Sequence, residues 1–204
     1  ACLGVPALTA MKAIRHGGNL DGKTVLITGG ASAVGHYALQ LAKLAGAEVF
    51  STVSNNVKAK IATAAGASHT LNYKEEDIGA GVSELTNGNG VDHMTDMDMS
   101  TYMPLYPKLV AIGGSIAAYG SNELSVNGIS PQDFFTHLLT LASVFLLLEP
   151  EDSIVDMADE ITKLCMSGKL IHNLGATFPL ESTADAHSSV ESGSVTGNVV
   201  IDIP

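Results

Sequence analysis

A glycine-rich turn is the segment whose residue types and spacing could bind a phosphate group. An apolar stretch, Thr24–Thr28, leads directly into Gly29, and an apolar helical pattern begins at Ala33. Gly29 permits a tight turn, and Gly35 lets the helix pack closely on the preceding strand. The first backbone amides of such a helix face a pyrophosphate, and the helix dipole favours its negative charge. The predicted dinucleotide-binding turn comprises Gly29, Ser32, Ala33, Val34 and Gly35.

Ser32 departs from the usual glycine pattern of such turns. Gly29, Ser32 and Gly35 have the spacing GxxGxxG with the middle glycine replaced. Serine is still small enough for a close backbone approach, and its hydroxyl adds a donor. A structural turn without a ligand is the alternative, because glycine is abundant in this chain, with 21 residues.

The residues after the second expected strand indicate which dinucleotide is bound. NAD sites usually place an acidic residue about 20 positions beyond the glycine turn, where it binds the ribose hydroxyls. Here that region reads Ser54, Asn55, Asn56, Val57 and Lys58, with no carboxylate. A hydroxyl, amides and a lysine suit a 2′-phosphate, although an ordinary solvated lysine is the alternative for Lys58. The sequence therefore predicts NADPH in preference to NADH, with Ser54, Asn55 and Lys58 among the residues that bind it.

The elements that would position these residues alternate along the chain. Apolar strand patterns occupy 24–28, 48–52, 69–73, 92–96, 109–112 and 115–119. Helical patterns lie between them at 33–45, 56–65 and 75–86. Strands that alternate with helices of about ten residues indicate βαβ units, and uninterrupted apolar strands indicate burial on both faces. We expect an α/β fold, a Rossmann-type doubly wound parallel sheet with helices on both faces and a core at about 20–150.

The two ends of the chain do not follow this alternation. A helix is expected at 5–16, and the apolar run 138–148 is too short to cross about 30 Å of hydrocarbon. We expect that run to form an edge strand that pairs with its copy in a homodimer, because an exposed apolar edge is a liability. The last patterns either extend the sheet or serve a neighbouring domain. They are a helix at 154–166, a segment at 169–180, a helix from Ser182 and a strand at 198–203.

Composition excludes several classes of function. The net charge of −11 and the lack of a basic run argue against nucleic acid as a partner. Cys2 and Cys165 form no CxxC pair, and the seven histidines lack ligand spacing, so no metal site is expected. No secretory signal or membrane segment is recognisable, which predicts a cytoplasmic location. Charged residues make up 15% of the chain, against about 25% in an average domain, so a partner is expected to cover part of the surface.

Further motifs, in order along the chain, extend the pattern of the glycine turn. They are Gly4–Ala10, Val25–Ala38, Gln40–Lys43, Ala65–Ala67, Asn72–Tyr73, Gly90–Asp92, Ala186–His187, and Glu191–Gly193 with Gly197. Together they resemble the quinone oxidoreductase (zeta-crystallin-like) branch of the medium-chain dehydrogenase/reductase superfamily. The sequence departs from that family at Ser32, at Asp96–Met99, which lacks the usual glycine, and at Asn198, where the family usually has lysine.

The resemblance implies roles for individual residues. Lys58 matches a family lysine that binds the 2′-phosphate, and Tyr73 matches a tyrosine near that phosphate and the adenine. Thr9 matches a threonine near the nicotinamide, and Gly120 with Ser121 matches a loop at the same end of the coenzyme. No residue of this chain is expected to be catalytic, because hydride transfer depends on positioning and shielding more than on a side-chain acid.

The same resemblance implies that residues 1–204 form the cofactor-binding domain of a larger enzyme. Family members carry an N-terminal GroES-like domain that holds much of the substrate pocket, and this chain does not include one. Residues 151–204 would return to that domain. The implied activity is zinc-independent hydride transfer from NADPH to a quinone or an electron-poor C=C bond. The alternatives are an enoyl reductase unit of a larger synthase and a non-catalytic dinucleotide-binding module.

Overall fold

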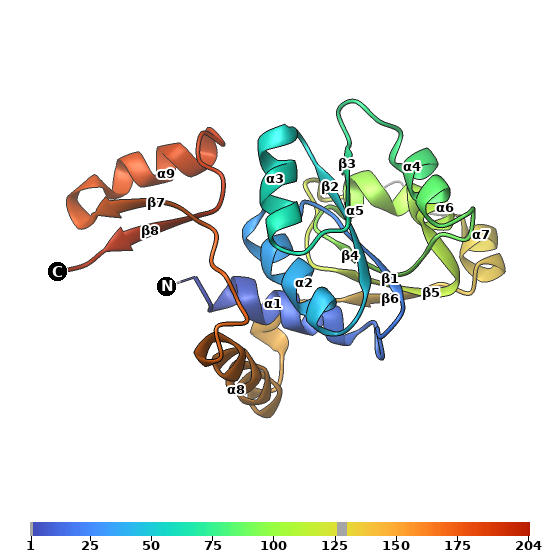
Figure 1. The fold of residues 1–204 in the computed structure, drawn as a ribbon, viewed down its shortest axis with the longest axis horizontal. Helices are drawn as coiled ribbons and strands as arrows, with labels where there is room; N and C mark the ends of the chain where they lie inside the picture. The colour runs from blue at the N-terminus through green and yellow to red at the C-terminus, as the bar shows by residue number, and fades with distance from the viewer. Residues whose placement is uncertain (1, 126–129) are drawn as a thin grey trace.

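Six parallel strands form the central sheet of the computed structural model, which describes residues 2–125 and 130–204 (Figure 1). The strands are β1 (Thr24–Ile27), β2 (Glu48–Val53), β3 (His69–Asn72), β4 (Val91–Asp96), β5 (Val110–Ala118) and β6 (Thr140–Ser143). Their order is β3-β2-β1-β4-β5-β6, and each neighbouring pair runs parallel. The expected Rossmann-type sheet is confirmed, with its switch point between β1 and β4.

Helices cover both faces of this sheet, because strand side chains alternate between the faces. In β1, Val25 and Ile27 enter one apolar core while Leu26 enters the other. The first core includes residues of α1 (Val5–Arg15), α2 (Ala33–Leu44) and α8 (Glu151–Met166), with Ala62 from α3 (Asn56–Ala64). The second includes α4 (Ile78–Leu85), α5 (Met99–Tyr102) and α6 (Tyr106–Leu109). The short helix α7 (Pro131–Thr136) precedes β6.

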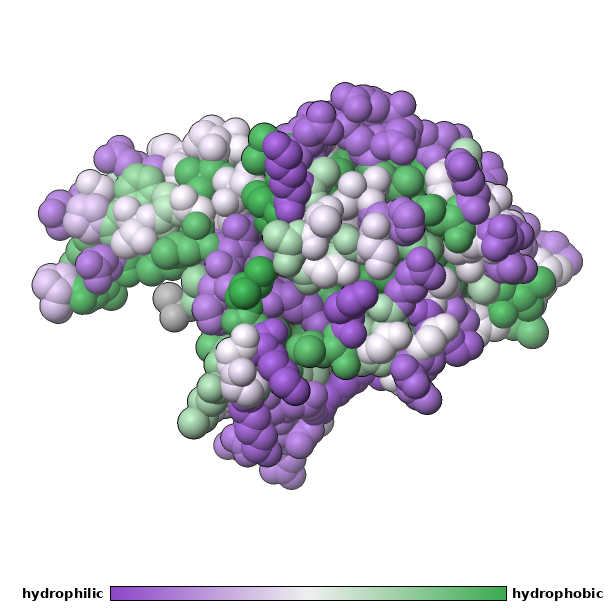
Figure 2. Space-filling model, viewed as in Figure 1, coloured by the Kyte–Doolittle hydropathy of each residue, from purple (hydrophilic) through white to green (hydrophobic). Residues whose placement is uncertain are grey.

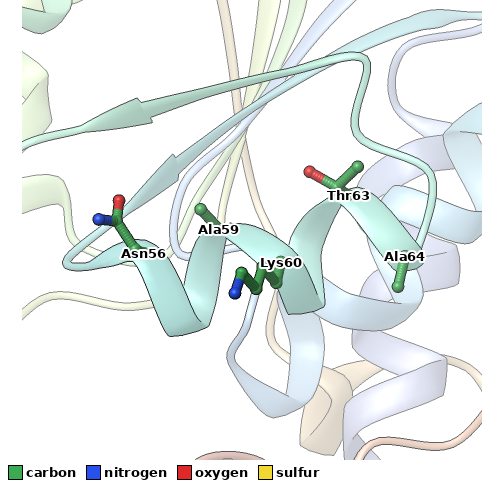
Figure 3. Close-up of a pocket in the computed structure, with 5 residues that line it drawn as sticks. All are labelled: Asn56, Ala59, Lys60, Thr63 and Ala64. Carbon is green, nitrogen blue, oxygen red and sulfur yellow. The ribbon is translucent and has the colours of Figure 1, made fainter.

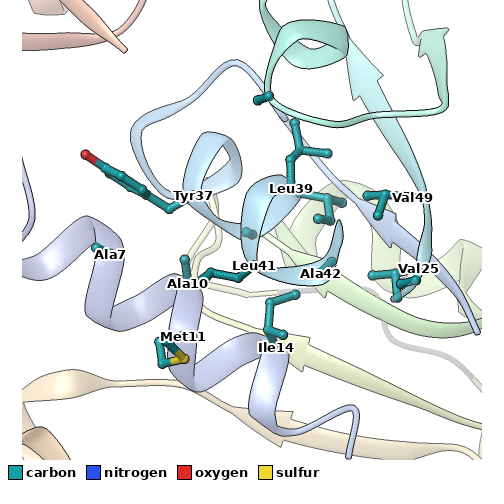
Figure 4. Packing of buried hydrophobic residues seen from close by; sticks show 14 of the residues in the cluster. Ala7, Ala10, Met11, Ile14, Val25, Tyr37, Leu39, Leu41, Ala42 and Val49 are labelled. Atoms are coloured by element: carbon teal, nitrogen blue, oxygen red, sulfur yellow. The ribbon is translucent and has the colours of Figure 1, made fainter. Parts of the chain in front are cut away.

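Small side chains let α1 pack closely on α2 in the first core (Figure 4). Ala7 and Ala10 of α1 are almost completely buried, and Ile14 lies one turn further along the same face. Leu41 and Ala42 of α2 complete this contact. Since α2 is also the helix that follows the glycine turn, its packing between α1 and the sheet holds the turn in place.

The prediction of two separate strands between residues 109 and 119 is wrong. The patterns at 109–112 and 115–119 belong to a single strand, β5, whose register against β4 shifts between Val91 and His93. Val91 pairs with Val110, whereas His93 pairs with Ser115, so β5 carries extra residues opposite β4. Gly113 has φ +79° within this bulge, a conformation that glycine adopts without strain. The two adjacent glycines therefore mark a bulge and not the end of a strand.

The third expected helix begins later than its acidic residues suggest. Asp77 has an extended backbone, and its carboxylate accepts a 3.0 Å hydrogen bond from the Ala80 amide. This side chain is the N-cap of α4, which starts at Ile78. Glu75 and Glu76 consequently lie in the turn after β3, at the carboxyl edge of the sheet.

Ion pairs hold α8 against α1. The Arg15 guanidinium lies 2.7 Å from Asp156 Oδ2 and 2.6 Å from Glu160 Oε2, two carboxylates one helical turn apart. Lys12, one turn earlier on α1, lies 2.9 Å from Glu149. The two Arg15 pairs are exposed, and exposed pairs contribute little stability each, so Met157 and Ile161, which are buried, carry most of the α8 contact.

The C-terminal segment does not extend the central sheet. β7 (Leu174–Pro179) and β8 (Asn198–Asp202) form a separate two-stranded parallel sheet, joined by α9 (Thr183–Glu191). This β7–α9–β8 unit lies to one side of the molecule, beside the N-terminus (Figure 1). Green apolar residues gather on it in the space-filling view (Figure 2), and Leu174, Leu180 and Val190 are exposed. Of the two alternatives for this segment, extension of the sheet is wrong.

The apolar run 138–148 lies at the edge of the central sheet, as expected. Only Thr140–Ser143 form the strand β6, which pairs with β5 and ends the sheet. The last leucines, Leu146–Leu148, turn into a short 3-10 helix. Within the described part of the chain, every helix is too short or too polar to traverse a membrane.

Candidate functional site

A cavity of about 710 Å³ lies at the carboxyl ends of the central strands. Open α/β sheets bind ligands at this edge, beside the switch point. The turns after β1, β2, β3 and β4 contribute most of its wall. The lining residues are Gly29, Ala31, Ser32, Ala33, Thr52, Val53, Ser54, Lys58, Tyr73, Glu76, Asp77, Ile78, Met97, Asp98, Thr101, Tyr102, Leu105, Asn122, Gly193, Val195, Thr196 and Gly197.

The glycine turn presents free donors to this cavity. Gly29 has φ +65°, and the Ser32 amide donates to its carbonyl over 2.8 Å. The Ser32 hydroxyl caps α2 by accepting a 3.1 Å bond from the Gly35 amide, which leaves the hydroxyl proton available to a ligand. The first intrahelical bond runs from His36 to Ser32, so the amides at the first two helix positions have no acceptor within the helix. The turn can therefore hold an anion.

Gly35 packs against the backbone of the turn and does not line the cavity. A Cβ on this residue would meet the Gly29 carbonyl oxygen and come within 3.0 Å of the Gly30 Cα. This backbone contact is the close helix–strand packing that the sequence predicts for the last glycine of the turn.

Gly35→Ala is expected to lower the free energy of unfolding by about 1–3 kcal/mol, because the new methyl overpacks a rigid backbone contact. Chemical denaturation followed by circular dichroism measures this change. Gly4→Ala is the matched control, since nothing lies within 4 Å of the Cβ that it adds. Equal stability of the two variants would contradict the tight packing of α2 on the turn.

Three residues predicted to contact the adenosine half meet at one end of the cavity. Ser54 and Lys58 follow β2, and Tyr73 follows β3, the neighbouring strand in the sheet. Asn55 does not line the cavity; its side chain caps α3 by accepting a 2.9 Å bond from the Lys58 amide. Its role in this structure is to fix the start of the helix that carries Lys58.

Two acidic residues at this end were not expected in the site. Glu76 lines the cavity, and its Oε1 accepts a 2.7 Å bond from the Asn72 amide. Asp77 lines the cavity too, while one of its oxygens caps α4. Their position between β3 and α4, just after a strand adjacent to β2, was the signal that could have placed them there. Their charges oppose that of Lys58, although both carboxylates already bind backbone amides.

A buried carboxylate anchors the turn after β4. Asp96 accepts hydrogen bonds from the Tyr106 hydroxyl (2.7 Å), the Asp98 amide (2.9 Å) and the Thr28 hydroxyl (3.3 Å). Burial raises the pKa of Asp96 above its usual value, and these donors only partly offset that effect. Asp96 is fully buried and does not line the cavity, so its role is to hold the turn after β4 in place and not to contact a ligand.

Asp98 ties the turn after β4 to the turn after β5. Its carboxylate accepts bonds from the Asn122 amide (2.9 Å) and the Asn122 side chain (2.8 Å), and also from the hydroxyls of Thr101 (2.6 Å) and Ser100. Burial acts to raise the pKa of Asp98, but these donors outweigh it and lower the pKa below the usual value. The carboxylate is therefore ionised and saturated with donors, and we call this contact the Asp98–Asn122 clasp.

Four other predicted site residues do not line the cavity. Val34 is the second residue of α2, and Thr9 is buried on α1. Gly120 packs against the Met97 carbonyl, and the Ser121 hydroxyl donates to the Glu123 carbonyl over 2.8 Å. The structure thus brings together the adenosine-side predictions and leaves the nicotinamide-side predictions outside this cavity.

The β7–α9–β8 unit contributes a wall that sequence reasoning did not include. Gly193, Val195, Thr196 and Gly197 all line the cavity opposite the glycine turn. They follow α9, far from β1 in the sequence. Nothing in the local pattern indicates this proximity, because it depends on how the C-terminal unit docks.

Two other places in the structure lack the converging polar groups of this cavity. A shallow depression on the outer side of α3 is lined by Asn56, Ala59, Lys60, Thr63 and Ala64 (Figure 3). Its residues all come from one helix, so it has no opposing wall. His36, which follows the glycine turn, is buried and lies 3.1 Å from the Gln40 side chain, away from the cavity lining.

Comparison with known proteins gives consistent relatives. Residues 33–163 match the family model described as zinc-binding dehydrogenase. Human quinone oxidoreductase is 25% identical over 203 residues, which are 98% of this chain and 61% of the relative. A highly reducing polyketide synthase of Gibberella zeae is 27% identical over 188 residues, which are 89% of this chain and 7% of the synthase. The chain spans about three-fifths of the length of the quinone oxidoreductase.

Solved structures share the fold along almost the entire chain. An NAD-dependent alcohol dehydrogenase is 30% identical with a TM-score of 0.87, and the match covers 98% of this chain and 57% of the other. A mycobacterial protein complexed with NADPH is 28% identical with a TM-score of 0.86, and the match covers 98% of this chain and 64% of the other. These two proteins are named with different nicotinamide coenzymes, so the residues of the cavity must decide between them.

Proposed function

Because this chain belongs to the zinc-binding dehydrogenase family, we propose that its cavity binds NADPH for an oxidoreductase. One observation carries the proposal: Gly29, Ser32 and Ala33 of the glycine turn line the same cavity as Lys58 at the switch point. The turn suits a pyrophosphate, and the lysine suits a 2′-phosphate. The whole enzyme would transfer hydride to a quinone or an electron-poor C=C bond, as the names of the quinone oxidoreductase relatives suggest.

The residues at the end of β2 support a phosphorylated ribose. Ser54 takes the place at which NAD sites usually carry an acid, so no carboxylate there repels a 2′-phosphate. Lys58 follows on the first turn of α3, whose amide end is fixed by the Asn55 cap. Glu76 and Asp77 follow β3 instead of β2, and each binds a backbone amide.

NADPH supplies the hydride when it is bound, and the chain supplies its binding and orientation. The amide of Ala33 and the Ser32 hydroxyl, which belong to residues that line the cavity, would donate to the pyrophosphate. Lys58 would bind the 2′-phosphate, and the Tyr73 ring would pack beside the adenine. Substrate recognition would come from sequence outside this chain, packed against the exposed apolar residues of the β7–α9–β8 unit. We propose that this additional sequence forms a GroES-like domain.

The name of the family implies zinc, but the described residues do not fit a zinc site. Structural zinc needs four ligands, and catalytic zinc needs three protein ligands with a water molecule. Residues 2–125 and 130–204 hold no group of three or more His, Cys, Asp or Glu side chains placed to bind a metal. Cys2 and Cys165 are free and pack against the first apolar core instead. The described residues therefore do not supply a set of side chains that could hold zinc by themselves.

An enoyl reductase unit of a larger synthase is the second candidate, and the similarity to the polyketide synthase supports it. Both candidates use the same coenzyme site, and they differ in the electron acceptor. A non-catalytic dinucleotide-binding module is the third candidate. Comparing the rates at which the full-length protein reduces a quinone and an enoyl thioester separates the first two candidates. Binding of NADPH without reduction of either acceptor would identify the third.

The chain is expected to bind NADPH at least about tenfold more tightly than NADH, because one charged hydrogen bond contributes about 1.5–3 kcal/mol. Parallel calorimetric titrations at a single ionic strength measure this ratio. Equal affinities would remove the assignment of a 2′-phosphate to Lys58, even if both coenzymes bind.

A homodimer through β6 is expected from the exposed apolar residues beside this edge. Leu147 and Leu148 are each 82% exposed, and Phe145 is 59% exposed. Replacing both leucines with aspartate should shift the chain to monomer in sedimentation equilibrium. Met166→Asp, at the end of α8, is the control, because it changes an equally exposed side chain away from the edge strand. A monomeric wild-type chain at high concentration would contradict the dimer.

A further inference from the structure

The Met97 side chain lies across the glycine turn, at the point where the two halves of a dinucleotide site meet. Gly29 has no side chain, and its vacant Cβ position is taken up by the Met97 sulfur. Met97 also lines the cavity together with Gly29 and Ser32, and it is 38% exposed. The methionine therefore covers part of the turn that should face a pyrophosphate.

The backbone of Met97 is held, so only its side chain can move. Its amide donates a 2.8 Å bond to the Thr28 hydroxyl, and its carbonyl packs against Gly120. Methionine is unbranched and adopts several rotamers at low cost. Met97 can thus turn away from Gly29 without a change in the fold of the turn after β4.

Beyond Met97, the ends of β4 and β5 are closely joined. The Tyr119 amide donates to the Asp96 carbonyl and the Met99 amide to the Gly120 carbonyl, both over 2.9 Å. The Asp98–Asn122 clasp adds two side-chain bonds across the same gap. Asn122 is accordingly the residue of the turn after β5 that lines the cavity, among those the structure describes.

The cavity therefore includes residues expected at the adenosine half of the coenzyme and leaves out those expected at the nicotinamide half. A doubly wound sheet binds a dinucleotide across both of its halves, on either side of the switch point. Here the walls come from the turns after β1, β2, β3 and β4, from Asn122 and from the segment after α9, while Gly120 and Ser121 lie outside. Met97 lies between these two groups of residues, with its sulfur against Gly29 and its carbonyl against Gly120.

We propose that Met97 is a specificity-determining residue that admits the nicotinamide half of the coenzyme only when its side chain turns away from Gly29. The proposal rests on the proposed NADPH function, and it concerns how that site distinguishes NADPH from its adenosine half. In the folded chain, the cavity binds 2′,5′-ADP at full strength. NADPH binds with an affinity reduced by the fraction of molecules in which Met97 has moved.

Calorimetric titration of 2′,5′-ADP and NADPH into the wild-type chain, Met97→Ser and Met97→Leu tests this. If the open rotamer is populated at about 10–20%, Met97→Ser should tighten NADPH binding by about five- to tenfold. The affinity for 2′,5′-ADP should stay within about twofold, and Met97→Leu, which keeps the bulk, should match the wild type. Because the chain contains no Trp, enhanced NADPH emission gives a second readout that reports the nicotinamide ring itself.

The outcomes separate this inference from the function on which it rests. If the wild type binds 2′,5′-ADP but Met97→Ser leaves NADPH affinity unchanged, the role of Met97 is overturned and the coenzyme site stands. If Met97→Ser tightens both ligands equally, the role is overturned as well, since the effect is not on the nicotinamide half. If 2′,5′-ADP does not bind the wild type, the NADPH function fails, and the role of Met97 fails with it.

Discussion

Lys58→Ala is expected to weaken NADPH binding by about 10- to 100-fold while NADH binding stays the same, since a charged hydrogen bond to phosphate contributes about 1.5–3 kcal/mol. Lys58 is the one lysine among the residues that line the cavity. It stands on the first turn of α3, whose start is fixed by the Asn55 cap. NADH lacks the 2′-phosphate, so it lacks the group whose binding the substitution removes.

Lys60→Ala is the matched control for this experiment. Lys60 belongs to the same helix but lines the shallow depression on its outer side, away from the cavity (Figure 3). Both variants change the net charge of −11 by the same amount. A similar loss in both would assign the effect to overall electrostatics. A loss of NADH binding that matches the loss of NADPH binding would show that Lys58 acts on another part of the coenzyme or on the fold.

His93 is expected to make the fold lose about 3 kcal/mol of stability as the pH falls from about 6.5 to about 4. The imidazole is fully buried in β4, where Nε2 lies 3.0 Å from the Ala13 carbonyl and Nδ1 lies 2.8 Å from the Ser115 hydroxyl. The carbonyl can only accept, so Nε2 carries the proton and Nδ1 accepts from Ser115. Burial lowers the pKa of His93 to about 4, because the charged ring has no water around it.

The direction of this pH dependence follows from which state takes up the proton. Above pH 6.5 the ring is neutral in both states, so the stability is fully present there. Between about 6.5 and 4 the unfolded chain binds a proton that the folded chain does not, and the stability falls. Asp96 acts in the opposite sense: its pKa is raised in the folded state, so its contribution is lost as the pH rises through that value.

Denaturant unfolding at pH 7 and pH 4.5 measures the loss, and His93→Gln isolates it. This variant is less stable at pH 7, since it loses packing, but its stability should change less between the two pH values. His187→Gln, at an exposed position on α9, should keep the wild-type dependence. Parallel pH slopes for wild type and His93→Gln would contradict the assignment and place the acid sensitivity elsewhere.

Most of the fold could be predicted from the sequence because its signals are local. The turn at Gly29, the Ser32 cap and the uninterrupted apolar strand 24–28 each act within a few residues. The prediction was wrong where a local signal has two structural meanings. Gly113 and Gly114 mark a bulge inside β5 as readily as a strand end, and the acids before Ile78 precede the helix instead of starting it.

The candidate site was predicted only in part, for a physical reason. Ser54, Lys58 and Tyr73 share one edge because neighbouring parallel strands end together, and that follows from strand order. Gly120 and Ser121 also follow a strand of this sheet, yet they do not line the cavity, and Gly120 lies against the Met97 carbonyl of the β4 turn. Strand order places a residue at an edge of a sheet, but side-chain packing decides whether it faces a ligand.

The sequence alone determined the βα alternation, the glycine turn and the absence of an acid after β2, because each of these depends on residue type and short-range spacing. The tertiary structure decided that Gly193, Val195, Thr196 and Gly197 line the same cavity as the turn, and it decided the Asp98–Asn122 clasp and the position of Met97 over Gly29. These contacts join segments that are far apart in the chain, and their energies depend on the distances between particular atoms. Those distances exist only after the sheet and its helices have packed.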